Sequence, residues 1–237
     1  MEWYWILLIV ITSILVWLLL STLFYKQIFK RFYDILLSSL AIIVLSPFFL
    51  IFTPINAICM KGNPFFCQYR PGKKRKDGKC KIFKLIKYRS MTNEKDKNGN
   101  LLPDDKRLTK FGKFLRSTSL DELPELFNIF VGDMSIVGPR PLLVQYLSRY
   151  NEKQSHRQDV RPGLTGYAQV HGRNVVSWED KFDMDVWYTQ HISMFGDIKI
   201  IFRTVITVLK KDGITSNTSV TNEEFMGTLD IKKDVAK

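Results

Sequence analysis

The amino-acid sequence predicts a membrane protein that is mostly α-helical with a few short strands. Three observations lead to this fold class. Residues 3–25 carry no charge, residues 35–60 form a second uncharged run, and the sequence after Gly62 mixes short elements with turn dipeptides. A length of 237 residues leaves room for one globular domain beside such segments. We therefore divide the chain into an amino-terminal transmembrane helix (1–25), a membrane-inserted region (26–60), one domain (61–213) and a polar tail (214–237).

The first uncharged run is long enough to cross a bilayer as one helix, which takes about 20 apolar residues. A cleaved signal peptide is the alternative, but no basic residue precedes the run and no small-x-small cleavage site follows it. Lys26, Lys30 and Arg31 come directly after the run, whereas Glu2 is the only charged residue before it. Because basic flanks stay in the cytoplasm, we expect the amino terminus outside and the domain inside.

The second uncharged run is interrupted by Ser46-Pro47 in its middle and by Pro54 near its end. Proline removes a helical hydrogen bond and disfavours helical geometry in the residue before it, so a break is expected near Ser46. An ordinary kinked span is the alternative, and it would carry the rest of the chain outside. Both flanks of the run are strongly basic, however, and both should stay inside. The sequence thus favours a re-entrant helix that breaks at Ser46 and Pro47 and returns.

The positive charge of the chain is concentrated next to these segments. Residues 25–90 contain 14 Lys and Arg against Asp34 and Asp77, which equals the whole formal charge of +12. A basic block prefers polyanions, which are nucleic acid, anionic lipid headgroups or phosphorylated substrates, and its position beside membrane segments favours anionic membrane lipids.

Cysteine and histidine give no sign of a metal or thiol site. Cys59, Cys67 and Cys80 are odd in number and lack the paired spacing of a zinc site, so we expect reduced, packed side chains. The three histidines are spread along the chain without the spacing of metal ligands: His156, His171 and His191.

In the domain, residues 81–89 mix basic and apolar side chains and are interpreted as a strand or a short amphipathic piece. Two helices are predicted from apolar faces, over residues 141–154 and 197–211. The second should end near Gly213, after Lys210 and Lys211.

The most informative polar residues are the adjacent carboxylates Asp121 and Glu122. Ser119 stands three residues before Glu122, which is the spacing of a capping box and predicts a helix start here. The alternative role is purely structural, because acidic residues stabilise many helix starts. Neighbouring residues on a helix do not face each other, so the pair cannot flank a glycosidic bond; it could share one metal ion or one phosphate.

Arginines in stiff or glycine-rich settings complement such a site, because the guanidinium group pairs with phosphate oxygens. Arg140 lies between two prolines, Arg161 opens Arg-Pro-Gly, and Arg173 follows Gly172. Each is a candidate ligand for a phosphate group.

With these motifs the chain resembles the monotopic phosphoglycosyl transferases, or bacterial sugar transferases, which start membrane glycan assembly on polyprenyl phosphate. The resemblance covers about residues 25–225. It is carried by ordered motifs: Tyr25-Lys-Gln-Ile-Phe-Lys-Arg-Phe-Tyr-Asp34, Ser46-Pro47, Gln68-Tyr-Arg-Pro-Gly72, Lys87-Tyr-Arg-Ser-Met91, Arg116 through Asn128, Gly132 through Pro141, Arg161 through Asn174 and Asp185-Val-Trp-Tyr188.

The resemblance implies a location in the bacterial inner membrane and a re-entrant helix broken at Ser-Pro. It also implies that Asp121 attacks the β-phosphate of a UDP-sugar, releases UMP and forms a phosphosugar-aspartyl intermediate, from which polyprenyl (undecaprenyl) phosphate takes the phosphosugar. Glu122 matches the acidic partner that helps hold Mg²⁺. Substrate contacts are implied for residues in the matching motifs: Arg140, Arg173, Arg161, Gln169 and Arg89. Oligomeric state does not transfer, because family members differ in their membrane modules.

Two rival functions stay open on the sequence. One is a glycosyltransferase that binds a metal through Asp183-Met-Asp185, and the other is a membrane scaffold without catalysis. Phosphosugar transfer liberates UMP whereas glycosyl transfer liberates UDP, so the released nucleotide separates the two enzymes.

Overall fold

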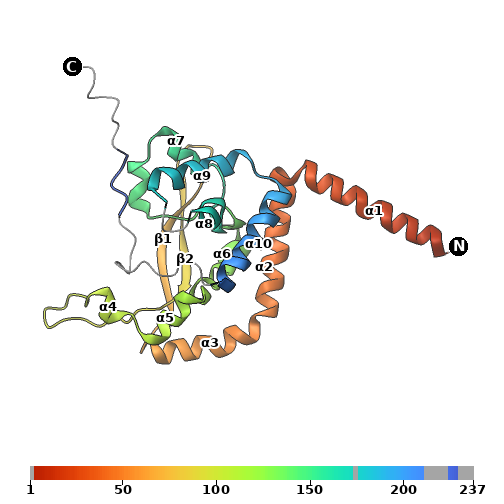
Figure 1. The fold of residues 1–237 in the computed structure, drawn as a ribbon. Coiled ribbons are helices and arrows are strands. Elements are labelled where there is room, and N and C mark those ends of the chain that lie inside the picture. The colour runs from red at the N-terminus through yellow and green to blue at the C-terminus, as the bar shows by residue number, and fades with distance from the viewer. Residues whose placement is uncertain (1–2, 173–175, 211–223, 229–237) are drawn as a thin grey trace, which may run out of the picture.

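The computed structural model describes residues 3–172, 176–210 and 224–228. Most of the described residues are helical, and the strands form two separate two-stranded sheets. A long amino-terminal helix extends away from the rest, and a bent pair of helices lines one side of a mixed domain (Figure 1). The predicted fold class, mostly α with a few short strands, is therefore confirmed.

Helix α1 (Trp3–Leu23) contains no charged residue, and nearly all of its side chains are exposed. Among the described residues it is the one continuous helix that is long and apolar enough to cross a membrane. Ser21, near its end, is buried and shares a 3.1 Å hydrogen bond with the hydroxyl of Tyr33. The predicted helix is thus present, and its insertion in a bilayer stays a prediction.

A π-helical turn (Tyr25–Phe29) connects α1 to α2 (Lys30–Val44), and α3 (Ser46–Cys59) follows after a sharp break. The two bent parts, residues 25–44 and 46–59, meet at 66°. Ser46 Oγ donates a 2.7 Å hydrogen bond to the carbonyl oxygen of Ile43, which the break would otherwise leave without its helical partner. Pro47 lies in the first turn of α3, where its missing N–H costs nothing. The predicted break is confirmed, whereas Pro54 lies inside α3 without ending it.

The domain begins with an antiparallel hairpin of β1 (Phe65–Lys74) and β2 (Cys80–Tyr88), so residues 81–89 are mainly strand. Its inward side chains join a core made by α6 (Glu125–Val131) and by one side of α2 and α3. The buried members are Phe83, Leu85, Leu126, Ile129 and Met134, with Ala41, Ile42, Leu45 and Phe49 packed against them. The domain therefore lies in the angle between α2 and α3 (Figure 1).

The remaining elements surround this core. Between the hairpin and α6 lie α4 (Asp104–Arg107), α5 (Lys110–Ser117) and a 3-10 helix (Leu120–Glu122). After α6 come β3 (Ser135–Val137), a 3-10 helix (Val144–Arg149), α7 (Glu152–Ser155), a 3-10 helix (His156–Gln158), β4 (Gly163–Thr165), α8 (Tyr167–His171), α9 (Trp178–Gln190) and α10 (Met194–Lys210). Strands β3 and β4 pair in parallel.

The predicted helix over residues 141–154 is wrong. The chain there forms the 3-10 helix Val144–Arg149, flanked by Leu143 and Tyr150 in extended backbone. A new helix, α7, then starts at a complete capping box between Asn151 and Gln154. Four of the five apolar residues that suggested one helical face instead pack into an aromatic cluster around Phe182: Leu142, Leu143, Tyr146 and Tyr150. The predicted helix over 197–211 is confirmed up to Lys210 as α10, which starts at Met194, while Lys211 and Gly213 lie outside the described residues.

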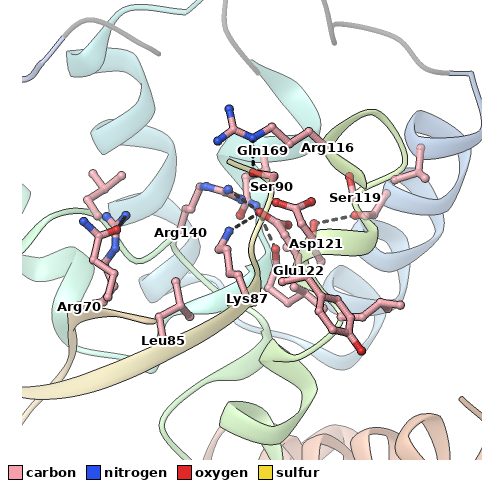
Figure 2. A pocket seen from close by; sticks show the side chains of 18 of the residues that line it. Arg70, Leu85, Lys87, Ser90, Arg116, Ser119, Asp121, Glu122, Arg140 and Gln169 are labelled. Atoms are coloured by element: carbon pink, nitrogen blue, oxygen red, sulfur yellow. Dashed lines mark hydrogen bonds and ion pairs between the residues drawn. The ribbon is translucent and has the colours of Figure 1, made fainter. Parts of the chain in front are cut away.

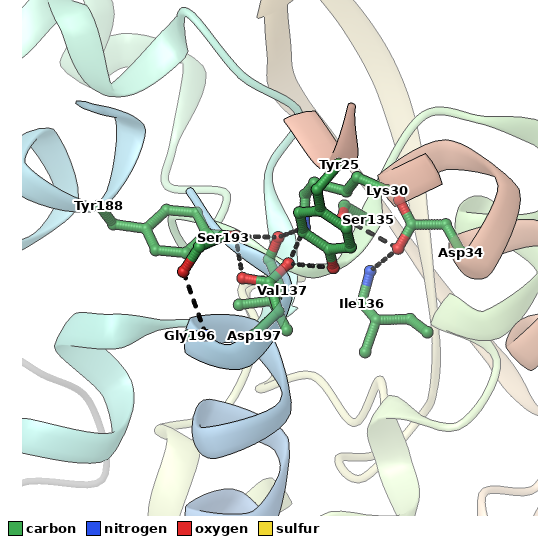
Figure 3. A network of polar contacts seen from close by, with 10 residues as sticks. All are labelled: Tyr25, Lys30, Asp34, Ser135, Ile136, Val137, Tyr188, Ser193, Gly196 and Asp197. Atoms are coloured by element: carbon green, nitrogen blue, oxygen red, sulfur yellow. Dashed lines mark hydrogen bonds and ion pairs between the residues drawn. The ribbon is translucent and has the colours of Figure 1, made fainter. Parts of the chain in front are cut away.

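Helix α2 is tied to β3 by a buried carboxylate (Figure 3). Asp34 accepts hydrogen bonds from Ser135 Oγ at 3.0 Å and from the backbone N–H of Ile136 at 2.9 Å. A buried charge needs such partners, and these two lie on the strand that leads into the Gly138-Pro-Arg140 segment.

A second contact to β3 runs through Lys30, whose ammonium group lies 2.9 Å from the carbonyl oxygen of Val137 and 2.6 Å from Asp197. Asp197 also accepts hydrogen bonds from the hydroxyls of Tyr25 and Tyr188, both at 2.8 Å (Figure 3). The start of the membrane-type helices thus fixes the strand that precedes Arg140.

Candidate active site

Asp121 and Glu122 lie on a short 3-10 helix between α5 and α6. The predicted capping box is wrong, because Ser119 adopts left-handed backbone geometry (φ 56°) and its side chain caps no helix. Helix α6 starts only at Glu125, after Pro124. The two carboxylates therefore lie on a tight turn rather than in the first turn of a long helix.

The turn opens into a cavity of about 870 Å³ that is lined by residues of the hairpin, α5, α8, α9 and α10. Figure 2 shows part of this lining around Asp121 and Glu122. Five of the residues predicted for the site line it: Asp121, Glu122, Arg140, Gln169 and Arg89. Several basic side chains that the sequence gave no role line it as well: Arg70, Lys87, Arg107, Arg116, Arg157 and Lys181. The cavity combines a strongly basic lining with a pair of carboxylates.

The side-chain carboxylate of Asp121 is not paired with any other described side chain. No described residue donates a hydrogen bond to its side chain or forms an ion pair with it. Burial and the neighbouring charge of Glu122 raise the pKa of Asp121 to about 6, against the opposing attraction of Lys87, Arg140 and Arg116. At neutral pH the group is mostly ionised and is free to react or to bind a cation.

Glu122 is held by two cations. Its Oε1 lies 2.6 Å from Arg140 Nη2 and 2.7 Å from Lys87 Nζ (Figure 2). Burial alone would raise the pKa of this carboxyl group, but Arg140 and Lys87 outweigh it and hold the pKa well below its usual value. Glu122 therefore stays ionised and fixes the two basic groups beside Asp121.

Lys87 and Glu125 extend this cluster, and sequence reasoning missed both. Lys87 Nζ also lies 3.0 Å from Glu125, whose pKa is raised by burial and by Glu122 although Lys87 opposes the shift. One signal was present in the sequence. Lys87 falls two residues after Leu85 and so points to the buried face of β2, where a lysine needs an acidic partner.

Three further arginines at the cavity, Arg116, Arg70 and Arg89, make polar contacts that leave some of their guanidinium nitrogens available. Arg116 Nε donates to Ser90 Oγ at 2.9 Å (Figure 2), and Arg70 donates to Gln68 at 2.6 Å. Arg89 makes a long contact of 3.4 Å to the carbonyl oxygen of Phe65. Because Arg70 and Arg116 join Arg140 from separate elements, the cavity can surround a group that carries more than one phosphate.

Of the two remaining predicted arginines, the structure describes only Arg161. Arg161 does not line the cavity; its Nε donates a 3.0 Å hydrogen bond to the carbonyl oxygen of Gly132, at the carboxyl end of α6. Arg173 lies outside the described residues. Arg161 therefore satisfies a helix end in this structure rather than facing the carboxylates.

Gln169 reaches the cavity from α8. Its Nε2 donates a 3.1 Å hydrogen bond to the carbonyl oxygen of Leu164, while its buried Oε1 accepts none from any described residue. A buried amide oxygen without a partner is costly, so this atom is suited to accept a hydrogen bond from a ligand.

The carboxylates of Asp183 and Asp185 lie apart. Asp185 is buried against Arg157 at 2.7 Å, whereas Asp183 is exposed and pairs with Lys153 at 2.7 Å. Each carboxylate is already matched to its own cation. This arrangement does not favour a metal site of the Asp-x-Asp type.

A divalent cation at this site would have to be bound by few protein side chains. Within the described residues no group of three His, Cys, Asp or Glu side chains is arranged to hold a metal ion. Mg²⁺, however, is commonly bound by one or two carboxylates together with substrate phosphates and water. Asp121, with its unpaired carboxylate, and Glu122 beside it fit that kind of site.

Fold and site together define an enzyme-like protein with membrane-type helices and a carboxylate set among anion-binding arginines. The chain belongs to the bacterial sugar transferase family, whose model matches residues 25–211, and it is a transferase.

Three relatives illustrate the range of the family. The chain is 48% identical over 207 residues to the uncharacterized sugar transferase EpsL of Bacillus subtilis, covering 86% of this chain and 99% of that one. It is 42% identical over 190 residues to a UDP-glucose:undecaprenyl-phosphate glucose-1-phosphate transferase of Klebsiella pneumoniae, covering 76% and 40%. It is 35% identical over 205 residues to an undecaprenyl-phosphate galactose phosphotransferase of Salmonella typhimurium, covering 79% and 42%. The chain thus spans less than half the length of the latter two enzymes.

Proposed function

We propose that this transferase moves a sugar 1-phosphate from a UDP-sugar to a polyprenyl phosphate such as undecaprenyl phosphate, with Asp121 as the nucleophile. The observation that carries the proposal is the unpaired Asp121 carboxylate inside a basic cavity, next to the Glu122, Lys87 and Arg140 cluster. The names of the Klebsiella and Salmonella relatives support the acceptor and the transferred group. The product starts membrane glycan synthesis.

The reaction balances in two displacements at one phosphorus atom. A carboxylate oxygen of Asp121 attacks the β-phosphorus of the donor, the bond from that phosphorus to the bridging oxygen breaks, and UMP leaves with the bridging oxygen. A phosphate oxygen of the polyprenyl acceptor then attacks the same phosphorus and releases the Asp121 carboxylate. Carboxylates form covalent phosphoryl intermediates of this kind in other enzymes.

The basic residues make the first displacement feasible. A carboxylate and a diphosphate repel each other, and fixed positive groups reduce that repulsion and stabilise charge on the departing UMP. Arg140 and Lys87 are held in place by Glu122, while Arg116 and Arg70 bring further positive charge to the cavity. The unpaired Oε1 of Gln169 can accept a hydrogen bond from a hydroxyl or amide group of the UDP-sugar.

Mg²⁺ is the proposed cofactor, with Glu122 as a ligand. When bound, the ion neutralises phosphate charge and stabilises the departing oxygen. Glu122 orients Arg140 and Lys87 whether or not the ion is present.

We also propose that α1 spans the bacterial inner membrane with its amino terminus outside, while α2 and α3 enter the bilayer and return to the cytoplasmic face. The basic flanks and the 66° bend support this topology. A cysteine placed at the exposed Lys95, in a chain whose own three cysteines are replaced by serine, should resist a membrane-impermeant thiol reagent in intact cells and react after lysis. Labelling in intact cells would contradict the topology.

Purified protein with Mg²⁺, polyprenyl phosphate and a panel of UDP-sugars should release UMP with at least one donor. Omitting the acceptor should leave one phosphosugar on the intact chain, visible as an added mass. Release of UDP instead would support a glycosyltransferase, and absence of turnover with every donor would support a scaffold.

The pH dependence of adduct formation tests the state of the nucleophile. Because the pKa of Asp121 is raised to about 6, adduct formation should fall about tenfold per pH unit below that value, whereas an ordinary aspartate would remain active to about pH 4. Leaving out the acceptor removes the titration of its own phosphate. The pKa of Glu125 is also raised, so Glu125→Gln serves as the control. If the loss of adduct formation at low pH disappears in Glu125→Gln, the titrating group is Glu125 and not Asp121, which contradicts our mechanism.

A further inference from the structure

Residues 224–228, far from the site in sequence, dock onto the domain through one aromatic side chain. Phe225 is 2% exposed, and its ring is surrounded by four other rings. The centroid distances are 4.9 Å to Phe182, 5.7 Å to Tyr146, 5.7 Å to Trp178 and 6.0 Å to Tyr150. The neighbouring Met226 is 74% exposed, so Phe225 alone of the two serves as the anchor.

Polar contacts fix the same peptide. The backbone N–H of Phe225 donates to the hydroxyl of Tyr146 at 3.2 Å, and Arg149 donates to the carbonyl oxygen of Phe225. Arg149 also pairs with Glu224 at 2.8 Å. The docked peptide is therefore held through both its backbone and its side chains.

Contacts continue from Phe225 to the carboxylates. The ring of Phe182, which packs on Phe225, lies 5.6 Å from the guanidinium carbon of Arg157. Arg157 Nη2 donates a 2.7 Å hydrogen bond to the carbonyl oxygen of Arg140. The side chain of Arg140 in turn lies 2.6 Å from Glu122. Each step is a direct contact.

Trp178 and Phe182 also form part of the cavity wall. One side of this pair faces the space proposed for substrate, and Phe225 packs against the pair. Because protein interiors are close-packed, removal of the Phe225 ring leaves a void into which these rings relax. Arg157, which lies over Phe182 and Tyr150, would follow them.

We infer that Phe225 is a positioning residue of the active site, which holds Arg140 over Glu122 through Phe182 and Arg157. The docked peptide 224–228 then contributes to the geometry of the active site and is part of the catalytic domain. The inference rests on the proposed function for its assay.

The test compares full-length Phe225→Ala with Met226→Ala, its exposed neighbour. With saturating donor and acceptor, kcat for UMP release should fall about 10- to 100-fold in Phe225→Ala, because a displacement of about 1 Å at a reacting group has effects of this size. Met226→Ala should match the wild type. Phe225→Leu keeps an apolar plug and should fold normally with an intermediate kcat, which keeps the test valid if Phe225→Ala does not fold.

A purely structural role is separated by a double-mutant cycle. If Phe225 acts through Arg140, adding the Phe225 substitution to Arg140→Lys should lower kcat by no more than about twofold further, because coupled residues are not additive. A full additional loss, or a lowered melting temperature with unchanged kcat, would overturn the inference. Failure of the wild type to release UMP would instead refute the proposed function.

Discussion

Asp121→Asn should abolish both UMP release and the covalent adduct, with a loss of turnover of about 1,000-fold or more. The amide has nearly the shape of the carboxylate but cannot attack phosphorus, so binding groups stay in place while the nucleophile is lost. Initial rates of UMP release give the first measurement. The intact mass after incubation with donor and Mg²⁺, without acceptor, gives the second.

Asp183→Asn is the matched control. Asp183 is exposed, pairs with Lys153 at the surface and belongs to the rival Asp-x-Asp tripeptide. Turnover in this variant should equal that of the wild type. The reverse pattern, with Asp183→Asn inactive and Asp121→Asn active, would move the chemistry to the rival site.

Stability separates catalysis from a structural role for Asp121. A carboxylate that only stabilised a helix start would lower the melting temperature when replaced. The folded pKa of Asp121, about 6, is above the value of about 4 for an unfolded chain, so its ionised form opposes folding once the pH exceeds both values. Asp121→Asn should therefore melt at the same or a higher temperature than the wild type at pH 7.5.

The membrane-type segments were predictable because their signals are local. An uncharged run and a Ser-Pro pair determine helix and break without a distant partner, and the break between α2 and α3 lies at Ser46-Pro47 as predicted. Strand β2 was also accessible, since alternation places Phe83, Leu85 and Lys87 on one face.

The errors arose where a distant contact decides the local structure. The capping spacing at Ser119 is overridden by the tight turn after α5, in which Ser119 takes a positive φ. Arg161 has the stiff setting of an anion ligand, and its Nε contacts the carbonyl oxygen of Gly132 in this structure, so its contact with substrate stays a prediction. Residues 141–154 have the apolar spacing of a helix, but several of these side chains form the pocket that holds Phe225. Phe225 itself belongs to the segment that the sequence predicted as a polar tail.

The second large effect is expected at the buried pair of Arg157 and Asp185. Their side chains are 1% and 7% exposed, and two hydrogen bonds of 2.7 and 3.1 Å join them. Arg157→Met leaves the Asp185 carboxylate buried without its cation, which should lower the free energy of unfolding by about 3–5 kcal/mol. Lys153→Met, which breaks the exposed pair with Asp183, should cost less than about 1 kcal/mol in the same denaturant titration.

The double variant Arg157→Met with Asp185→Leu separates folding from catalysis. Without either charge no unpaired charge is left buried, so stability should largely return, apart from the smaller cost of the hydrogen bond that the carbonyl oxygen of Arg140 loses. Activity should not return, because the carbonyl oxygen of Arg140 loses its hydrogen bond from Arg157. No other described group donates to that oxygen. A stable double variant with wild-type turnover would show that Arg157 only supports the fold. A stable variant with low turnover would show that one guanidinium group both neutralises Asp185 and sets the position of the arginine that faces Glu122.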